Sequence, residues 1–553
     1  MDQKRMLLAL ALSVGLMWAW IMLFGDNKPK PAPTPPPQAA QSQTQTSKGQ
    51  APTSTTPAQQ APAPAAPAPG AVLSGPETLV EVKTPLYTAI FTSRGGGVRT
   101  VSLQDYYNHP EKQGGHFAVL DLAEGQPASL AFNLTKLAPK LDTQNFTPST
   151  DKLRVTQGTK TLTFTTTVAG VTVEKTYVFR ADSYAWDLKV RLINNSGKPL
   201  GLQPSLGLVE AKKRAESAAY AFTGIQYSKD GHYNEMSAGD LDDNPKDTGD
   251  IKYLALSIPY FMGAVAPLDA QGAAPAKRFV AGSEAGPLMV ATVIEPLVEL
   301  APGTSRELGY LVYYGPKDLK ILNPLGHDLS DAVDFGWFDV IAKPFLIVMN
   351  FIYDFIGNYG IAIIFVTLLT KLIFWPLTRK SYQSMKSMQS LQPHVKRIRE
   401  KYADDKQRMN QEIMQLYKTY KVNPAGGCLP MVVQIPVFIA FYKVLGNAIE
   451  LRHAPFMLWM NDLSAPDRLP IGFDIPYVGA GLPVLTLLMG ASMFLQQKMT
   501  PTTGDPTQAK MMLMMPVVFT VMFINFPAGL VLYWLVNNLF SIGQQYLTNK
   551  SKT

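Results

Sequence analysis

The run from Gly357 to Thr378 constrains the fold most, because Lys371 is the only charged residue among its 22 residues. A helix of about 20 apolar residues crosses the hydrocarbon core of a bilayer, so the run predicts a membrane span. A charge inside a span costs about 2.5–3.5 kcal/mol on insertion scales, which makes such a residue functional by default. Since no Asp or Glu in the run pairs with it, Lys371 indicates a wet cavity that admits something polar.

Threonines share the helical face of Lys371. Thr367, Lys371 and Thr378 are spaced by four and seven residues, which stacks them along one face that Thr370 borders. Other apolar runs add polar side chains that we expect to line the same half-channel: Gln434, Tyr533, Trp534 and Asn537. Two alternatives stay open. The first is that Lys371, roughly 10 Å from the predicted cytoplasmic end, only extends its ammonium to the inner membrane interface. The second is that each of the other polar groups makes an interhelical hydrogen bond, which is the more common role of such a group, and does not line a channel.

Four further apolar runs follow, at residues 426–446, 478–498, 511–526 and 528–547. Near the N-terminus, Lys4 and Arg5 precede the apolar run Met6–Phe24, which is longer than the core of a cleavable signal peptide and is not followed by a clear A-x-A cleavage site. We therefore predict a retained transmembrane anchor over residues 1–26. The chain then has six spans, five of them in a helical membrane core over residues 357–548.

Residues 27–70 are rich in Pro, Ala, Gln, Thr and Ser, a composition that predicts an extended, disordered linker. Over residues 71–330, apolar and polar residues alternate, most clearly in Thr161–Asn194. Alternation bounded by turn residues predicts antiparallel strands with one buried face, and its length predicts one large all-β sandwich. The single cysteine, Cys428, excludes an intrachain disulfide.

The segment Phe335–Asp354 is rich in aromatic residues and contains Pro344, and polar residues interrupt its apolar face. It predicts an interfacial amphipathic helix within residues 331–356, on the outer membrane face. The alternative is that it extends the next span.

Loop charges predict the topology. Residues 379–421 contain 11 Lys or Arg against 4 Asp or Glu, and basic loops remain in the cytoplasm. Both ends of the chain, including a short tail over residues 549–553, are then cytoplasmic. The β domain lies outside, which is the periplasm in a Gram-negative cell.

The basic loop 379–421 has apolar residues at spacings of three and four on both sides of Asp404 and Asp405, which predicts a helical hairpin. Asp404, with Gln407 three residues later, resembles a helix-start cap. Its basic residues include Lys396, Arg397 and Arg399. A basic face of this kind suits anionic lipid, ribosomal RNA or a nascent chain. The alternative is that the charge only sets the topology.

Several function classes are excluded by absent motifs. The sequence lacks G-x-x-x-x-G-K-[ST], H-E-x-x-H and G-x-S-x-G, and one Cys with six scattered His forms no clear metal cluster. We expect no cofactor, no metal and no enzymatic activity. A channel or transporter is a rival, although the spans show no inverted repeat and no second deep ionisable residue. A periplasmic carbohydrate-binding or cell-wall protein with a large anchor is the other rival.

Five stretches carry a resemblance to a known family: Leu391–Pro393, Asp404–Arg408, Val422–Cys428, Gln497–Thr503 and Phe526–Tyr533. In this order, and with this architecture, the chain resembles the YidC-type membrane protein insertases of Gram-negative bacteria. The resemblance implies a β-supersandwich and a hydrophilic groove that is open to the cytoplasm and to lipid. Lys371 stands where the family usually has an arginine, and Trp534 where it often has a second tyrosine.

The resemblance also implies how such a protein works. A short polar or acidic tail enters the groove near Lys371, and burial of the client's apolar helix in lipid drives insertion without nucleotide hydrolysis. The implied partners are nascent membrane proteins, the Sec translocon and ribosome–nascent chain complexes, with anionic lipids but no DNA.

Overall fold

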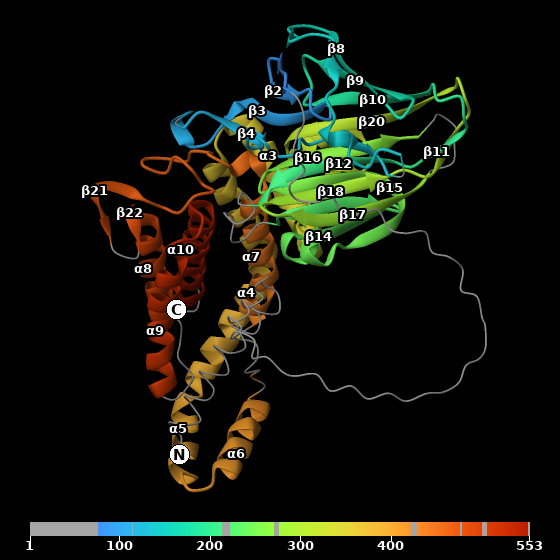
Figure 1. Cartoon of the computed structure of the whole chain (residues 1–553). Helices are drawn as coiled ribbons and strands as arrows, with labels where there is room; N and C mark the ends of the chain where they lie inside the picture. Colours follow the sequence, from blue (N-terminus) through green and yellow to red (C-terminus); the bar gives the residue numbers. More distant parts are fainter. Residues whose placement is uncertain are drawn as a thin grey trace, which may run out of the picture. The chain divides into compact units, whose positions relative to one another are not determined.

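The structure, a computed structural model, describes residues 76–112, 114–135, 137–212, 222–269, 276–420, 422, 429–475, 478–499 and 506–550. The predicted anchor over residues 1–26, the predicted linker over residues 27–70 and Cys428 lie outside them. A β-rich part comes first along the described chain, and a helical part follows it (Figure 1).

Two large sheets build the β-rich part. The smaller sheet has the order β4-β3-β2-β1-β7, in which only β1 and β7 pair in parallel. Its strands are β1 (Leu79–Lys83), β2 (Tyr87–Thr92), β3 (Gly97–Tyr107), β4 (His116–Asp121) and β7 (Lys152–Arg154). A long sheet and its side branch supply most of the remaining strands, and this extent of sheet confirms the predicted large β domain.

The long sheet has the order β5-β12-β18-β17-β15-β16-β20-β10-β9-β8-β6, with β13 and β14 branching from β15. Its pairs are antiparallel. The strands are β5 (Ala131–Leu134), β6 (Thr147–Pro148), β8 (Thr159–Val168), β9 (Val171–Arg180), β10 (Ala185–Asn194), β12 (Pro204–Ala211), β13 (Gly224–Lys229), β14 (His232–Ser237), β15 (Lys246–Ile258), β16 (Phe261–Leu268), β17 (Lys277–Ala285), β18 (Leu288–Ile294) and β20 (Ser305–Pro316). The short strands β11 (Leu200–Leu202) and β19 (Val298–Leu300) form a separate pair.

Strand β9 shows why the alternating sequence folds this way. Val171, Val173, Tyr177 and Phe179 are all fully buried, because successive side chains of a strand point to opposite faces and this face packs into the core. Lys175 occupies the same face and is equally buried. Its Nζ donates to the carbonyl oxygens of Gly95 and Leu130, at 2.9 and 2.8 Å, so the buried charge has polar partners.

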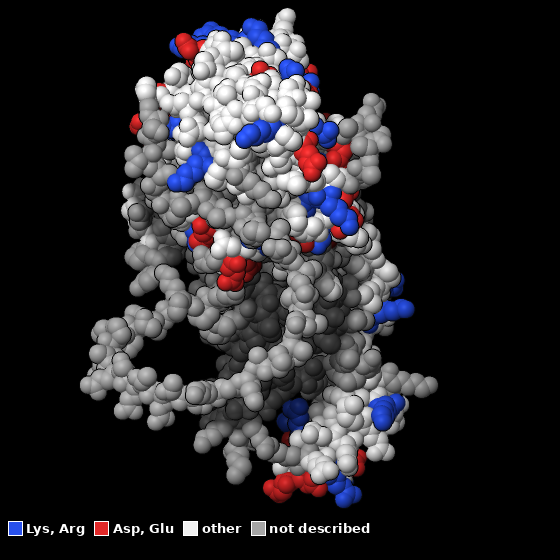
Figure 2. Space-filling model, turned by 45° about the vertical axis from the view of Figure 1, so that its right-hand side comes forward, with Lys and Arg blue, Asp and Glu red and all other residues white. Residues whose placement is uncertain are grey.

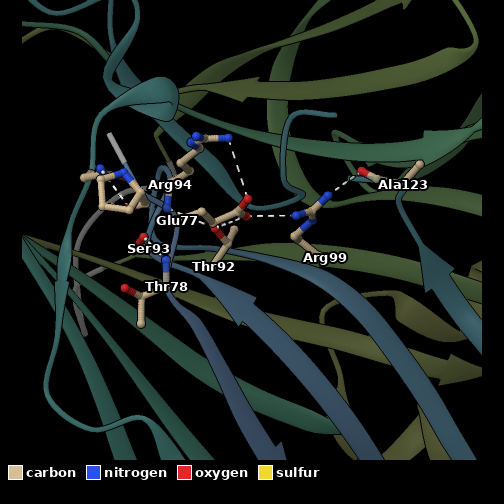
Figure 3. A network of polar contacts seen from close by, with 9 residues as sticks. Glu77, Thr78, Thr92, Ser93, Arg94, Arg99 and Ala123 are labelled. Carbon is tan, nitrogen blue, oxygen red and sulfur yellow. Dashed lines mark hydrogen bonds and ion pairs between the residues drawn. The ribbon is translucent and has the colours of Figure 1, made fainter. Parts of the chain in front are cut away.

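Figure 3 shows the polar network that fastens the start of the described chain to the smaller sheet. Glu77 Oε1 accepts from Thr92 Oγ1 at 2.6 Å and from Arg99 at 2.9 Å, and Glu77 Oε2 lies 3.6 Å from Arg94. Arg99 also donates to the carbonyl oxygen of Ala123. Glu77 therefore holds the segment before β1 against β2 and β3.

The helical part contains α2 (Leu319–Leu322), α3 (Asp339–Ile356), α4 (Tyr359–Ser390), α5 (Gln392–Lys401), α6 (Lys406–Thr419), α7 (Leu429–Asn447), α8 (Val484–Met499), α9 (Pro506–Phe523) and α10 (Ala528–Lys550). Within the described ranges, α4 alone is long and apolar enough to count as a candidate span, and Met512–Phe523 is a shorter apolar helix. Polar residues in the C-terminal half of α10 lower its hydropathy. The six spans stay a prediction.

Some predicted boundaries differ from the structure. The predicted span 357–378 is only the first two thirds of α4, which continues to Ser390. The predicted span 478–498 begins too early, because α8 starts at Val484. Gly479 and Gly481 have φ values of 92° and 105° and belong to β22 (Gly479–Leu482), which pairs with β21 (Leu469–Ile475). A positive φ is incompatible with an α-helix, and the pairing was not predicted.

Helix α3 lies within the segment predicted to be interfacial. Its buried residues are Ala342, Leu346 and Met349. On another face, apolar side chains are 61–100% exposed at spacings of three, four or seven: Trp337, just before the helix, then Val340, Ile347, Phe351 and Phe355. A helix with one apolar face against protein and another facing outward is suited to a lipid interface.

Candidate functional site

Lys371 lies on α4 and reaches across to α10. Its Nζ donates to Ser541 Oγ at 2.8 Å, and the lysine is partly buried. No ion pair joins it to any Asp or Glu in the parts of the chain that the structure describes. A cation without a carboxylate partner, held inside a helical bundle, is a candidate binding group for an anionic or strongly polar ligand.

Helix α10 carries a row of polar residues that includes Ser541, the hydrogen-bond partner of Lys371. It packs against α4 and α8 (Figure 1). Its polar residues recur at spacings that place them on one side of a helix: Asn537, Asn538, Ser541, Gln544 and Gln545. We call these five residues the α10 polar stripe.

Hydrogen bonds connect the α10 polar stripe to both neighbouring helices. Gln544 Nε2 donates to Thr378 Oγ1 on α4 at 2.8 Å. Asn538 Nδ2 donates to Ser492 Oγ on α8 at 3.0 Å. Gln545 Nε2 donates to the carbonyl oxygen of Met499, also on α8, at 2.6 Å. Hydrogen bonds of this kind join helices where an apolar environment leaves few other partners.

The predicted threonines differ in what their hydroxyls do. Thr367 and Thr370 are buried, and their hydroxyls donate to the carbonyl oxygens of Ile363 and Val366, one turn earlier in α4. Both hydroxyls thus have partners within their own helix. Thr378 bonds its own helix in the same way and also accepts from Gln544, so it links α4 to α10.

The remaining predicted groove residues fall into a pair, an aromatic cluster and one amide. Gln434 Nε2 on α7 donates to the Tyr533 hydroxyl on α10, and the Tyr533 ring stacks on Phe441 with centroids 4.6 Å apart. Trp534 packs edge-on against Phe438 at 4.9 Å, among other aromatic rings. Asn537 Oδ1 is buried and has no hydrogen-bond partner among the described residues.

Sequence reasoning missed Ser541, Gln544 and Gln545 as site residues. The signal was available, because these residues continue the helical spacing from Asn537 and Asn538 into the last turns of the same run. Their partners on α4 and α8 were not predictable from spacing. These contacts depend on how two helices pack, and more than 100 residues of sequence separate Ser541 from Lys371.

The predicted cytoplasmic hairpin is present as the end of α4 followed by α5 and α6. It has a small core of its own, made of Met388, Leu391, Val395 and Tyr417. The cap of α6 is Asp405, which accepts from the Arg408 backbone N–H at 2.9 Å. The prediction of Asp404 as the cap was wrong by one residue, because α6 begins at Lys406 and the residue before it takes the capping position.

The basic residues predicted on this hairpin are only partly free of acidic neighbours. Lys396 and Arg397 are exposed and Arg399 is partly buried, while Asp404 and Asp405 are exposed beside them. Lys396 Nζ lies 3.9 Å from Glu400 on the same helix. On the face drawn in Figure 2, basic and acidic side chains are interspersed rather than gathered by sign.

Metal chemistry has no candidate site within the described ranges, where no group of three His, Cys, Asp or Glu side chains is placed to hold an ion. The chemistry of the described site is therefore that of one ammonium group, hydroxyls and amides. Such a set binds and orients polar groups.

Comparisons with known proteins match both parts of the chain. Residues 79–348 match the family described as YidC periplasmic domain, and residues 351–553 match the family described as 60Kd inner membrane protein. The membrane protein insertase YidC of Pelobacter propionicus is 43% identical over 491 residues, which cover 85% of this chain and 86% of that protein. The membrane protein insertase YidC of Syntrophobacter fumaroxidans is 46% identical over 399 residues, 71% of each chain.

Among solved structures, an active YidC insertase crystal structure with its first transmembrane domain resolved is 18% identical to this chain. The alignment covers 85% of this chain and 94% of that one, with a TM-score of 0.37.

Proposed function

Because the chain belongs to the YidC family of membrane protein insertases, we propose that it inserts nascent membrane proteins by receiving their polar tails at Lys371. The family is one of insertases rather than enzymes, and its members are inner membrane proteins with a periplasmic domain. The proposal goes further, because it assigns a site and a physical mechanism to this chain.

The observation that carries the proposal is the ammonium of Lys371, which lacks a carboxylate partner among the described residues and lies beside the α10 polar stripe. A polar tail that leaves water for a bilayer loses its hydration, which is the main cost of translocating it. Hydroxyl and amide groups offset part of that cost, and an ammonium group attracts a tail that carries Asp or Glu. We assign this role to Lys371, Thr378 and Asn537, with Gln434 and Tyr533 as a second polar pair.

Burial of the client's apolar helix supplies the driving force. A helix of about 20 apolar residues gains on the order of 0.8 kcal/mol for each CH₂ group that leaves water. This gain needs no nucleotide, in agreement with a sequence that lacks a phosphate-binding loop. Aromatic rings on α7, α9 and α10, with Trp534 among them, offer a surface along which such a helix can move.

We propose the same topology that loop charges predict, with six spans, cytoplasmic termini and the β domain in the periplasm. The groove then opens to the cytoplasm and to lipid. The exposed apolar side chains of α3 support its placement at the outer membrane interface. The exposed Lys396 and Arg397 support contact of the hairpin with anionic lipid or ribosome–nascent chain complexes. Cooperation with the Sec translocon is part of the proposal and rests on the family.

Reconstitution tests the proposal. Purified protein in liposomes receives a single-span client with an acidic tail, and protease protection of the tail reports its translocation. Wild type is compared with Lys371→Ala, Lys371→Arg and Lys371→Glu. Lys443→Ala is the matched control, since Lys443 lies near one end of α7 and has no part in the site.

We expect protection with wild type, Lys371→Arg and the Lys443→Ala control, and loss of protection with Lys371→Ala and Lys371→Glu. Equal protection with wild type and Lys371→Glu would refute attraction by Lys371 while leaving the insertase activity in place. Protection no better than in empty liposomes would contradict the function in this system, and measurement of ion flux would then test the channel alternative.

A further inference from the structure

The contact between Lys371 and Ser541 leaves most of the lysine's hydrogen-bonding capacity unused. A lysine ammonium has three N–H donors. One donates to Ser541 Oγ at 2.8 Å, and the structure gives the lysine no other hydrogen bond within the described residues. Two of the three donors are therefore available to another acceptor.

Ser541 is oriented to act as the acceptor in this contact. Its own hydroxyl donates to the carbonyl oxygen of Asn537, one turn earlier in α10, at 2.8 Å. With the proton committed to that carbonyl, the oxygen lone pairs remain for Lys371. Ser541 is buried, so water competes poorly for these contacts.

The neighbouring contact fixes the register in which Ser541 meets Lys371. Gln544, one turn after Ser541, donates to Thr378, two turns after Lys371. Two successive turns of α10 are thus bonded to α4, which prevents α10 from sliding by one turn. A free lysine side chain has many rotamers and can turn toward the membrane interface. A fixed acceptor on the neighbouring helix keeps it between α4 and α10.

We propose that Ser541 is a positioning residue, which holds the Lys371 ammonium between α4 and α10 with two donors presented to the carboxylate of a client's tail. The inference rests on the proposed function. It adds to that function the residue that fixes the position of the flexible Lys371 side chain. It assigns no direct contact between Ser541 and the client. Its effect is therefore confined to clients that Lys371 itself recognises.

Two clients that differ only in charge provide the test. Both carry one apolar span, with two Asp residues in the tail of the first and two Asn residues at the same places in the second. Initial rates of protease protection are measured in liposomes for wild type, Ser541→Ala and Ser541→Thr. Ser492→Ala is the matched control, because Ser492 is also a buried serine that accepts from an amide but does not touch Lys371.

A hydrogen bond to a charged group contributes about 1.5–3 kcal/mol, so we expect Ser541→Ala to slow the acidic client about tenfold or more. We expect Ser541→Ala to leave the insertion rate of the neutral client unchanged. Ser541→Thr keeps the hydroxyl, so it should insert the acidic client at the wild-type rate. Ser492→Ala should change the rates of the two clients by the same factor. An equal fall for both clients with Ser541→Ala would show a general packing role and overturn the inference.

The same substitutions in a Lys371→Met background separate the two proposals. If Ser541 acts through Lys371, Ser541→Ala causes no further loss for the acidic client in that background. A full additional loss would overturn the positioning role. If Lys371→Met inserts both clients as well as wild type does, the proposed function of Lys371 fails; if Lys371→Met is defective while Ser541→Ala is normal, only the positioning role fails.

Discussion

Arg278 and Glu295 form an ion pair inside the β-rich part, with Nε 2.9 Å from Oε2 and each side chain only 5% exposed. Asp269 accepts from the same guanidinium at 2.6 Å. Burial, with the nearby Glu295 carboxylate as a second cause, raises the pKa of Tyr310 well above its usual value. Arg278 thus bridges two carboxylates, and it compensates the charge of the buried Glu295.

Removal of one partner of this pair should be severely destabilising. We expect Arg278→Met to lower the free energy of unfolding by about 3–5 kcal/mol, because Glu295 is left buried and uncompensated. Urea unfolding followed by tryptophan fluorescence measures this. Arg191→Ala is the control, since Arg191 lies 3.9 Å from Glu174 in an exposed pair and should cost at most about 1 kcal/mol. A similar effect of the two substitutions would contradict the importance of burial.

Lys175 should make the stability of the β-rich part depend on pH. Burial lowers its pKa from 10.5 to about 7, while the nearby Asp142 opposes this shift more weakly. Below about pH 7 the lysine is protonated in both states and its burial penalty is constant. Between about pH 7 and 10.5 only the unfolded state keeps the proton, so stability rises with pH, by up to about 1.4 kcal/mol per pH unit.

Urea midpoints measured from pH 6 to 10 test this dependence, with Lys175→Met as the comparison. We expect the slope of stability against pH to be smaller in Lys175→Met, because that side chain does not titrate. Lys317 is also buried, with its pKa lowered to about 8, and it leaves a residual slope of the same sign in both proteins. Identical slopes in the two proteins would show that Lys175 does not titrate in this range.

Asp467 should stabilise the start of α8. This buried carboxylate accepts from the Trp459 indole at 2.7 Å and from the backbone N–H groups of Leu485 and Thr486, in the first turn of the helix. We expect Asp467→Ala to cost about 1–3 kcal/mol, because the helix loses its cap and the partly buried Trp459 indole N–H loses its acceptor. Asp467→Asn keeps an acceptor and should cost less.

The emission of Trp459 offers a local readout for the same substitution. The other tryptophans are replaced by phenylalanine so that Trp459 alone is observed. We expect Asp467→Ala to shift its emission to longer wavelength as the ring gains contact with water, and Asp467→Asn to leave it nearly unchanged. An unshifted emission in Asp467→Ala would mean that the residues around Trp459 keep its indole ring in place without the Asp467 carboxylate.

Glu77 should control how firmly the start of the β-rich part is held. We expect Glu77→Ala to raise the hydrogen-exchange rates of β1 amides, because Arg99, itself buried, loses its carboxylate partner. Glu77→Gln keeps a neutral acceptor for Thr92 and should have a smaller effect. Unchanged exchange in β1 with Glu77→Ala would show that the strand's own pairing with β2 and β7 suffices.

The residues explain how far the sequence could predict this structure. The alternation in Thr161–Asn194 predicted β8, β9 and β10, because each strand buries one face. Lys175 follows the same alternation and lies on the buried face of β9. It could not identify the carbonyl groups of Gly95 and Leu130 that receive this lysine, since they lie 45 or more positions away. Local patterns report which face is buried, but they carry no information on which distant segment covers it.

The same limit applies to the candidate site. Lys371 stood out because a single charge in an apolar run is conspicuous in any window of sequence. Its partner Ser541 was inconspicuous, because serine is common in helices and the contact depends on the packing of α10 against α4. The β21–β22 hairpin was missed for a related reason. Its glycines lie beside the apolar residues that begin α8, so the two elements read as one apolar run.

Glu77 has a mechanical consequence. The carboxylate sits just ahead of β1, and its contacts with Arg99 and Thr92 bind it to two other strands of the same sheet. A force applied to the chain on the N-terminal side of Glu77 acts on the contacts of Glu77 with Arg99 and Thr92 before it acts on β1. That force is shared between the contacts of Glu77 and strand β1, which is hydrogen-bonded to β2 on one edge and to β7 on the other. A pull from that side is therefore resisted by the Glu77 contacts as well as by the hydrogen bonds of β1.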